Sequence, residues 1–213
     1  MSTYSGKCGE NLEWHYDNDT NELSISGNGI MEDFYVSDGE DNRPWTGYAS
    51  KVKSITITRN VRSIGAMAFC RFTSLESIVI PPFVDRIGDT AFADCVSLKR
   101  VCFIPNTSGN ITVKIEFGAF WRCKNLESVT MPIRGELLDC VFYECSALRC
   151  ISIPEGTKCI YDETFYRCES LVEVHVPNAI ECIEPDAFEE CKKLKHVIIP
   201  NSVKKIGIFE IEG

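Results

Sequence analysis

The stretch SLESIVIPPFVDRIGDTAFADC, residues 74–95, contains the pattern that decides the fold. Its segment LESIVI has the spacing L-x-x-L-x-L, and its alternation of apolar and polar residues is typical of a short strand. Pro81 then ends the strand, because proline has no N–H to donate to a ladder. A second extended segment, VDRI, stops at Gly88, and we expect one tight helical turn at residues 91–92 before the chain returns.

The same pattern recurs along the chain, as in SLVEVHVPNAIECIEPDAFEEC at residues 170–191. Four residue types each occupy a fixed position of the repeat, called here a slot. They are the phenylalanines Phe69, Phe92, Phe120, Phe142, Phe165 and Phe188; the leucines Leu75, Leu98, Leu126, Leu148, Leu171 and Leu194; the cysteines Cys95, Cys123, Cys145, Cys168 and Cys191; and the prolines Pro81, Pro105, Pro132, Pro154, Pro177 and Pro200. The phenylalanines are separated by 23, 28, 22, 23 and 23 residues. Such a unit buries its apolar face only against its neighbours, so the sequence predicts a solenoid.

The expected fold class is therefore α/β but β-rich: a curved leucine-rich-repeat horseshoe of short parallel strands with a stacked phenylalanine spine. We expect six to seven repeats over residues 51–213, the last one incomplete, with Ile211 in its phenylalanine slot. The polar insertion NTSGN, at residues 106–110, lengthens the third repeat.

Residues 1–50 do not repeat, and we expect them to form an N-terminal β cap over the first open core face. Two alternating runs flank the turn-rich segment at residues 17–21, which predicts a β-hairpin. The DGEDN run at residues 38–42 is expected to be a solvated loop. It lacks the full set of spaced ligands of a calcium-binding EF-hand loop.

The repeat resembles the BspA-like class of leucine-rich repeats, found on bacterial and protist cell-surface proteins. The residues that carry the resemblance are the I-P after the strand, V-x-x-I-G, A-F and C-x-x-L, from Val52 to about Ile206. The segment before the repeats also resembles the leader of such bacterial proteins, at Cys8–Gly9, Trp14, residues 23–29 and Pro44–Trp45. The resemblance implies a secreted or cell-surface location and adhesion to host, matrix or other cell proteins. It marks the repeat residues as scaffold.

Composition excludes several classes of function. The net charge is −9 without a basic stripe, which argues against nucleic-acid and anionic-membrane partners. No apolar run is long enough to insert into a membrane, and the polar residues 1–13 lead us to expect no signal peptide within this chain. No phosphate-binding loop, dinucleotide motif or nucleophile elbow occurs. We therefore expect no catalytic residue, no cofactor and no metal, and a partner that is a protein.

The five-cysteine column is expected to be buried and reduced, each thiol lending a weak hydrogen bond to turn backbone. Cys159 and Cys182 should lie side by side, roughly 4.8 Å apart by strand spacing. Because side chains on adjacent parallel strands seldom reach the required dihedral, the prediction is against a disulfide there. Cys102 and Cys150 are the expected exposed thiols. His15, His175 and His196 are read as surface residues.

The strand positions between the buried L-x-x-L-x-L residues should point outward and form the binding face. The candidate residues are Lys53, Thr56, Glu76, Val79, Lys99, Arg100, Glu127, Thr130, Arg149, Ser152, Val172, Glu173, His175, Lys195, His196 and Ile198. Two alternatives to a binding module are a structural or targeting module of a larger surface protein and, least favoured, an enzyme.

The C-terminal end of the array leaves a core face and a strand edge open. We expect Ile199, Val203, Ile206 and Ile208 at or near this edge. Residues 209–213 fold back over it, or two molecules pack end to end about a two-fold axis, or the native protein continues into further repeats. The shortness of the tail favours the end-to-end homodimer.

Overall fold

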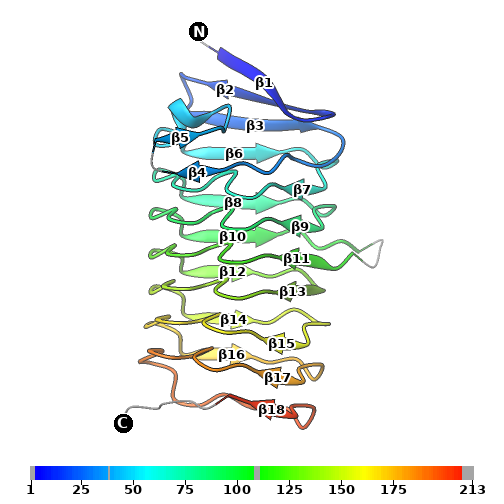
Figure 1. Cartoon of the computed structure of the whole chain (residues 1–213), viewed down its shortest axis with the longest axis vertical. Coiled ribbons are helices and arrows are strands. Elements are labelled where there is room, and N and C mark those ends of the chain that lie inside the picture. The colour runs from blue at the N-terminus through cyan, green and yellow to red at the C-terminus, as the bar shows by residue number, and fades with distance from the viewer. Residues whose placement is uncertain (1–2, 38, 108–110, 208–213) are drawn as a thin grey trace.

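The computed structural model describes residues 3–37, 39–107 and 111–207. Two columns of short strands run down the long axis of the molecule, with the N-terminus at one end and the last repeat at the other (Figure 1). Ile208, Ile211 and the tail whose folding back was one alternative lie outside the described residues. Among those residues, no helix has the length and apolar character needed to cross a bilayer.

The first column contains the strands of the L-x-x-L-x-L segments: β6 (Ser54–Ile57), β8 (Ser77–Ile80), β10 (Arg100–Phe103), β12 (Ser128–Thr130), β14 (Cys150–Ser152) and β16 (Glu173–His175). The second column contains β7 (Ser63–Ile64), β9 (Arg86–Ile87), β11 (Val113–Ile115), β13 (Gly135–Leu137), β15 (Cys159–Ile160), β17 (Cys182–Ile183) and β18 (Lys205–Ile206). Every recorded pairing within the columns is parallel and in register, so Val101 lies between Ile78 and Val129. The predicted leucine-rich-repeat fold of short parallel strands is thus confirmed.

The two columns are joined by turns in place of the helical turn expected at the A-F pairs. In the best-formed repeat, Thr90 and Asp94 have positive φ angles of 49° and 56°. The N–H of Ala91 closes a turn within its own repeat, whereas the N–H of Phe92 donates to the carbonyl of Ala119 in the next repeat at 2.8 Å. Backbone groups in the turns therefore alternate between local bonds and bonds to the next repeat. These bonds satisfy hydrogen-bonding groups of the turn backbone without a helix.

The spine phenylalanines stack in one continuous row. Successive ring centroids from Phe69 to Phe188 lie 5.4–5.6 Å apart, and from Phe92 onward the rings are within 8° of parallel. Trp45, from the segment before the repeats, stacks on Phe69 at 5.6 Å and begins the row. All these rings except Phe188 are fully buried, so the predicted spine is confirmed.

The cysteine column lies beside the spine, and its thiols are buried and free, as predicted. Each thiol donates to the carbonyl of the spine phenylalanine in the preceding repeat, with S–O distances of 3.1–3.2 Å: Cys95 to Phe69, Cys123 to Phe92, Cys145 to Phe120, Cys168 to Phe142 and Cys191 to Phe165. Burial raises the pKa of every thiol in the column. The column therefore stays protonated and joins one repeat to the next.

The N-terminal cap is a three-stranded antiparallel sheet whose last strand continues into the array. The predicted hairpin is present as β2 (Leu12–Asp17) and β3 (Glu22–Gly27), and β3 pairs in parallel with β6. A further strand, β1 (Thr3–Gly9), pairs with β2 and was not expected. Its segment TYSGKCG has no apolar alternation and most of its residues are exposed, so pairing of its backbone with β2 holds it in place.

Donors from the cap satisfy three carbonyl groups at the first open turn. The backbone N–H of Phe34 donates to Ala66 at 3.0 Å, and the indole N–H of Trp45 donates to Ala68 at 2.8 Å. The guanidinium of Arg43 donates to the carbonyl of Cys70. Trp45 is followed by the short 3-10 helix η1 (Thr46–Tyr48).

The expectation of a solvated DGEDN loop is wrong for part of that run. A short hairpin forms from β4 (Val36–Ser37) and β5 (Glu40–Asp41). Asp41 forms an ion pair with Arg43, whose side chain is 3% exposed. Burial disfavours the charged form of Asp41, but hydrogen bonds from Arg43 and Thr46 outweigh it and lower the pKa of Asp41 to about 2. The carboxylate therefore neutralises a buried cation, which a solvated loop would not do.

The first column ends one strand earlier than expected. Lys195, His196 and Ile198 were placed on a final strand, but residues 195–199 form no strand. This segment has a neighbouring repeat on one side only, and Ile199 is 39% exposed although its slot faces the core elsewhere. Within the described residues no repeat packs against the far side of this segment, and this one-sided packing leaves it out of the ladder, whereas β18 of the same repeat still pairs with β17.

We expect Phe165→Ala to lower the free energy of unfolding by about 3–5 kcal/mol, because it leaves a cavity between two stacked rings. Chemical denaturation would measure this loss. Phe117, which is 41% exposed, supplies the matched control, and Phe117→Ala should cost no more than about 1 kcal/mol. Equal losses in the two variants would contradict the role of the spine.

We expect Asp41→Asn to lower stability at pH 7 by roughly 2–3 kcal/mol, since the pKa of Asp41 falls from an ordinary value of 3.8 to about 2 on folding. A lowered folded-state pKa stabilises the protein above about pH 4, and this contribution is lost as the pH falls towards 2. The difference between the wild type and Asp41→Asn should therefore shrink between pH 5 and pH 2. A difference that stays constant over this range would rule out the ion pair as its source.

Candidate interaction surface and a cysteine pair

The outward face of the first column, called here the strand face, consists of the sixteen candidate positions predicted above. Fifteen of them are exposed, and Lys99 is half-buried. Those on β6 to β16 and the residues just before these strands form adjacent rows. β8, β10 and β12 pair in register, as do β14 and β16, while β6 lies next to β8 and β12 next to β14 without pairing as a ladder. Lys195, His196 and Ile198 continue the face without strand backbone.

Charges alternate along the first row of the strand face, where Glu76, Lys99, Glu127 and Arg149 follow one another in successive repeats. The ammonium of Lys99 lies 3.4 Å from the carboxylate of Glu76. An exposed pair of this kind contributes at most about 1 kcal/mol. The alternation therefore keeps like charges apart and leaves most of these groups available to a partner.

Two arginines and several apolar side chains on the strand face are available for contact. Within residues 3–37, 39–107 and 111–207, no carboxylate lies within 4.0 Å of the guanidinium of Arg100 or Arg149. Val79, Val172 and Ile198 are 50, 53 and 80% exposed.

The histidines do not converge on a metal site. The Nε2 atom of His175 lies 3.5 Å from a carboxylate oxygen of Glu173 in the same strand. Both His175 and His196 are exposed. Of the side chains that the structure describes, the one group of three or more metal-ligating residues contains neither histidine. Cys102 and Cys150 are exposed on the strand face, as predicted.

A charge ladder along the turns was missed by the sequence reasoning. The guanidinium of Arg122 lies 3.5 Å from the carboxylate of Asp94 in the preceding repeat and 3.7 Å from that of Glu144 in the next. The guanidinium of Arg167 lies 3.8 Å from the same Glu144 carboxylate. The signal was present, because the residue two places after the spine phenylalanine alternates in sign from repeat to repeat: Arg71, Asp94, Arg122, Glu144, Arg167 and Glu190. This ladder places opposite charges next to each other along the stacked turns, which is favourable.

A pocket beside the insertion in the third repeat is a second candidate for contact. It has a volume of about 350 Å³, and its lining includes Pro82, Phe103, Ile104 and Ile133. Ile104 and Ile133 are 45 and 55% exposed. The pocket lies on the side of the insertion and not on the strand face.

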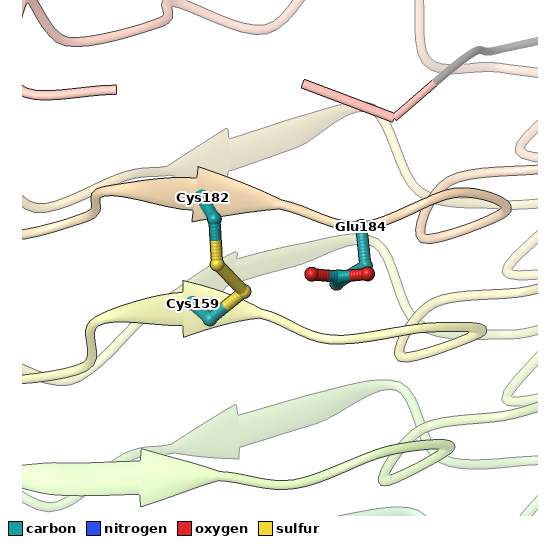
Figure 2. A group of neighbouring side chains, drawn as sticks. All are labelled: Cys159, Cys182 and Glu184. Atoms are coloured by element: carbon teal, nitrogen blue, oxygen red, sulfur yellow. A yellow bond between two sulfur atoms is a disulfide. The ribbon is translucent and has the colours of Figure 1, made fainter. Parts of the chain in front are cut away.

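Cys159 and Cys182 form a disulfide between β15 and β17, so the prediction against a bond is wrong (Figure 2). The predicted separation was sound: their Cα atoms lie 4.7 Å apart, within the usual range of about 4.4–6.8 Å for bridged cysteines. The two residues occupy the same slot in successive repeats and are paired in register, so their side chains meet despite the parallel strands.

Glu184, two residues after Cys182, lies beside the sulfur atoms (Figure 2). Its carboxylate and the two sulfurs are all within 4.8 Å of one another. Cys159 is buried, while Cys182 and Glu184 are partly exposed. Sequence reasoning did not single out Glu184, because most repeats have a different residue in this slot, such as Gly88 or Leu138.

Comparisons with known structures support the fold. A leucine-rich cell surface protein from Faecalibacterium prausnitzii matches with a TM-score of 0.62 and 26% identity, over 97% of this chain and 51% of that one. The chain thus spans about half the length of that protein. The T. pallidum leucine-rich repeat protein matches with a TM-score of 0.60 and 25% identity, over 90% of this chain and 89% of that one. A search of curated proteins finds no match.

The sequence itself matches the BspA type leucine-rich repeat region in six copies, over residues 47–134 and 107–210. These residues include both strand columns, the spine and the cysteine column, so the match covers the whole repeat array. Families built from leucine-rich repeats are generally non-catalytic and commonly serve in protein interaction. The chain belongs to the BspA-type leucine-rich repeat family.

Proposed function

We propose that the chain is a non-catalytic protein-binding module that uses the strand face to adhere to another protein. The observation that carries this proposal is the combination, on one continuous exposed surface, of the free guanidinium groups of Arg100 and Arg149 with the exposed Val79 and Val172. Arginine together with apolar side chains is typical of the centre of a protein interface. The matching partner surface offers carboxylates beside an apolar patch.

We place this activity at the cell surface or in the secreted fraction, and expect a host, matrix or neighbouring-cell protein as the partner. This step is supported by the cell-surface description of the Faecalibacterium prausnitzii protein and remains an analogy between relatives. A structural or targeting module within a larger surface protein is the rival interpretation. It differs in having no tight partner of its own.

We expect the triple variant Arg100→Ala/Arg149→Ala/His175→Ala to weaken binding to a matrix protein by about tenfold or more. Fewer than about 30% of interface residues cost more than about 1 kcal/mol on truncation, but arginine is enriched among them, and about 1.4 kcal/mol corresponds to tenfold. Surface plasmon resonance on a panel of immobilised matrix proteins would first identify a binder and then compare the variants.

The control variant Arg62→Ala/Lys158→Ala removes two exposed cations that lie in or beside the second column, and it should leave the affinity unchanged. A thermal melt confirms that both variants fold. If the triple variant binds as the wild type does, the site is not on the strand face, and the pocket beside the insertion becomes the next candidate. If no protein binds, the interpretation as a structural module without a tight partner is favoured.

We also propose that two molecules pack end to end through the last repeat. Ile206 on β18 is 50% exposed and Ile199 is 39% exposed, and β18 pairs on one side only, with β17. An open apolar edge of this kind favours association.

Light scattering over a concentration series should show a monomer–dimer equilibrium that Ile206→Lys shifts to the monomer. Val79→Lys, which adds the same charge on the strand face, should leave it unchanged. A monomer at every concentration would exclude the pairing.

A further inference from the structure

The disulfide site joins three successive repeats. Cys159 and Cys182 come from β15 and β17, and the ammonium of Lys205 on β18 donates to a carboxylate oxygen of Glu184 at 3.0 Å. Figure 2 shows Glu184 beside the sulfur atoms and not directed away from them. The bridge therefore has an ionisable oxygen ligand next to it that a purely structural disulfide does not need.

These residues form a metal-binding set when the sulfurs are thiolates. Two thiolates and one carboxylate are ligands that Zn²⁺ accepts, and three protein ligands leave a fourth position for water. On a tetrahedral ion with sulfur bonds of about 2.3 Å, the two sulfurs lie about 3.8 Å apart, a separation that fits the 4.7 Å between the Cα atoms. Three anionic ligands, one dication and the neighbouring Lys205 sum to zero charge, so the site is balanced.

We propose that, after reduction of the disulfide, Cys159, Cys182 and Glu184 bind one thiophilic divalent cation of the Zn²⁺ class. The partly exposed Cys182 and Glu184 provide the route by which the ion enters, and the buried Cys159 provides the inner ligand. Disulfide and metal are mutually exclusive at this site, because the same two sulfurs form either bond.

The chemistry balances in two steps. A small dithiol transfers two electrons and two protons to the Cys159–Cys182 bond and is itself oxidised to its cyclic disulfide, which leaves two protein thiols. The metal dication then displaces one proton from each thiol and forms two metal–sulfur bonds. Glu184 contributes its carboxylate without a change of oxidation state.

The remaining cysteines in the described residues do not offer an equivalent site. The thiols of the cysteine column each bond to a phenylalanine carbonyl within the core, and burial keeps them protonated. Cys8, Cys70 and Cys140 are buried and are not part of a three-ligand group. Cys102 and Cys150 are exposed and are likewise not part of one. They could nevertheless bind added metal weakly and would obscure the measurement.

The test therefore uses the full chain in a Cys102→Ser/Cys150→Ser background. The protein is reduced with dithiothreitol, freed of the reductant without air, and titrated with Co²⁺, whose thiolate complexes have a characteristic charge-transfer absorption. We expect one equivalent of Co²⁺ to bind with this absorption, and Zn²⁺ to displace it. The oxidised protein should show none.

Three variants in the same background assign the ligands. Cys182→Ser should abolish the absorption, and Cys159→Ser should do the same. Glu184→Gln should retain it while weakening the affinity by about tenfold or more. Glu181→Gln, which removes a nearby carboxylate outside the group, serves as the matched control and should bind as the background does. A thermal melt establishes that each variant is folded.

Failure of the reduced, folded background protein to give the absorption would overturn the proposal, as would equal Co²⁺ binding by Cys182→Ser. Should either cysteine variant unfold, Glu184→Gln still decides the ligand set, because an affinity equal to that of the background excludes Glu184. None of these results depends on the strand face, so the proposed function can fail or hold independently.

Discussion

One constraint governs this molecule: each side chain has as its main neighbour the residue in the same slot of the next repeat. Stacking like on like is favourable for phenylalanine rings, which form the spine from Phe69 to Phe188, and for thiols that each find a carbonyl in the preceding repeat. It is unfavourable for like charges. The turns accordingly alternate acidic and basic residues, so that Arg122 lies between Asp94 and Glu144.

The same constraint explains how much of the structure the sequence could predict. Once the repeat length was known, slot and neighbour followed for the residues of the array, except at residues 195–199, where the expected strand is absent. The spine, the buried cysteine column and the exposure of Cys102, Val79 and Arg100 were therefore predictable. The separation of Cys159 and Cys182 was predictable as well, whereas the bond between them was not, because the choice depends on side-chain rotation and not on slot.

Features that do not recur from repeat to repeat could not be predicted in this way. β1 has no apolar alternation, and its place is fixed by backbone pairing with β2. The buried pair of Asp41 and Arg43 lies within a run of polar residues that is typical of a loop. Glu184 matters only through its position beside two sulfurs, and few other repeats have an acid in its slot. In each case a particular contact, and not a recurring pattern, determines the structure.

The backbone bonds of the turns give the array a polarity. Along the turns, N–H groups such as those of Phe92, Phe120 and Phe142 donate to the following repeat, so carbonyl oxygens face the N-terminal end. The cap meets these oxygens with donors. At the other end, the N–H groups of Phe188 and Glu190 have no acceptor in the part of the chain that the structure describes. A unit that extends the array there has to bring oxygen acceptors to the turns. Two identical ends would set donor against donor at the turns, so the proposed two-fold contact would have to lie away from the turns, at β18 and Ile199.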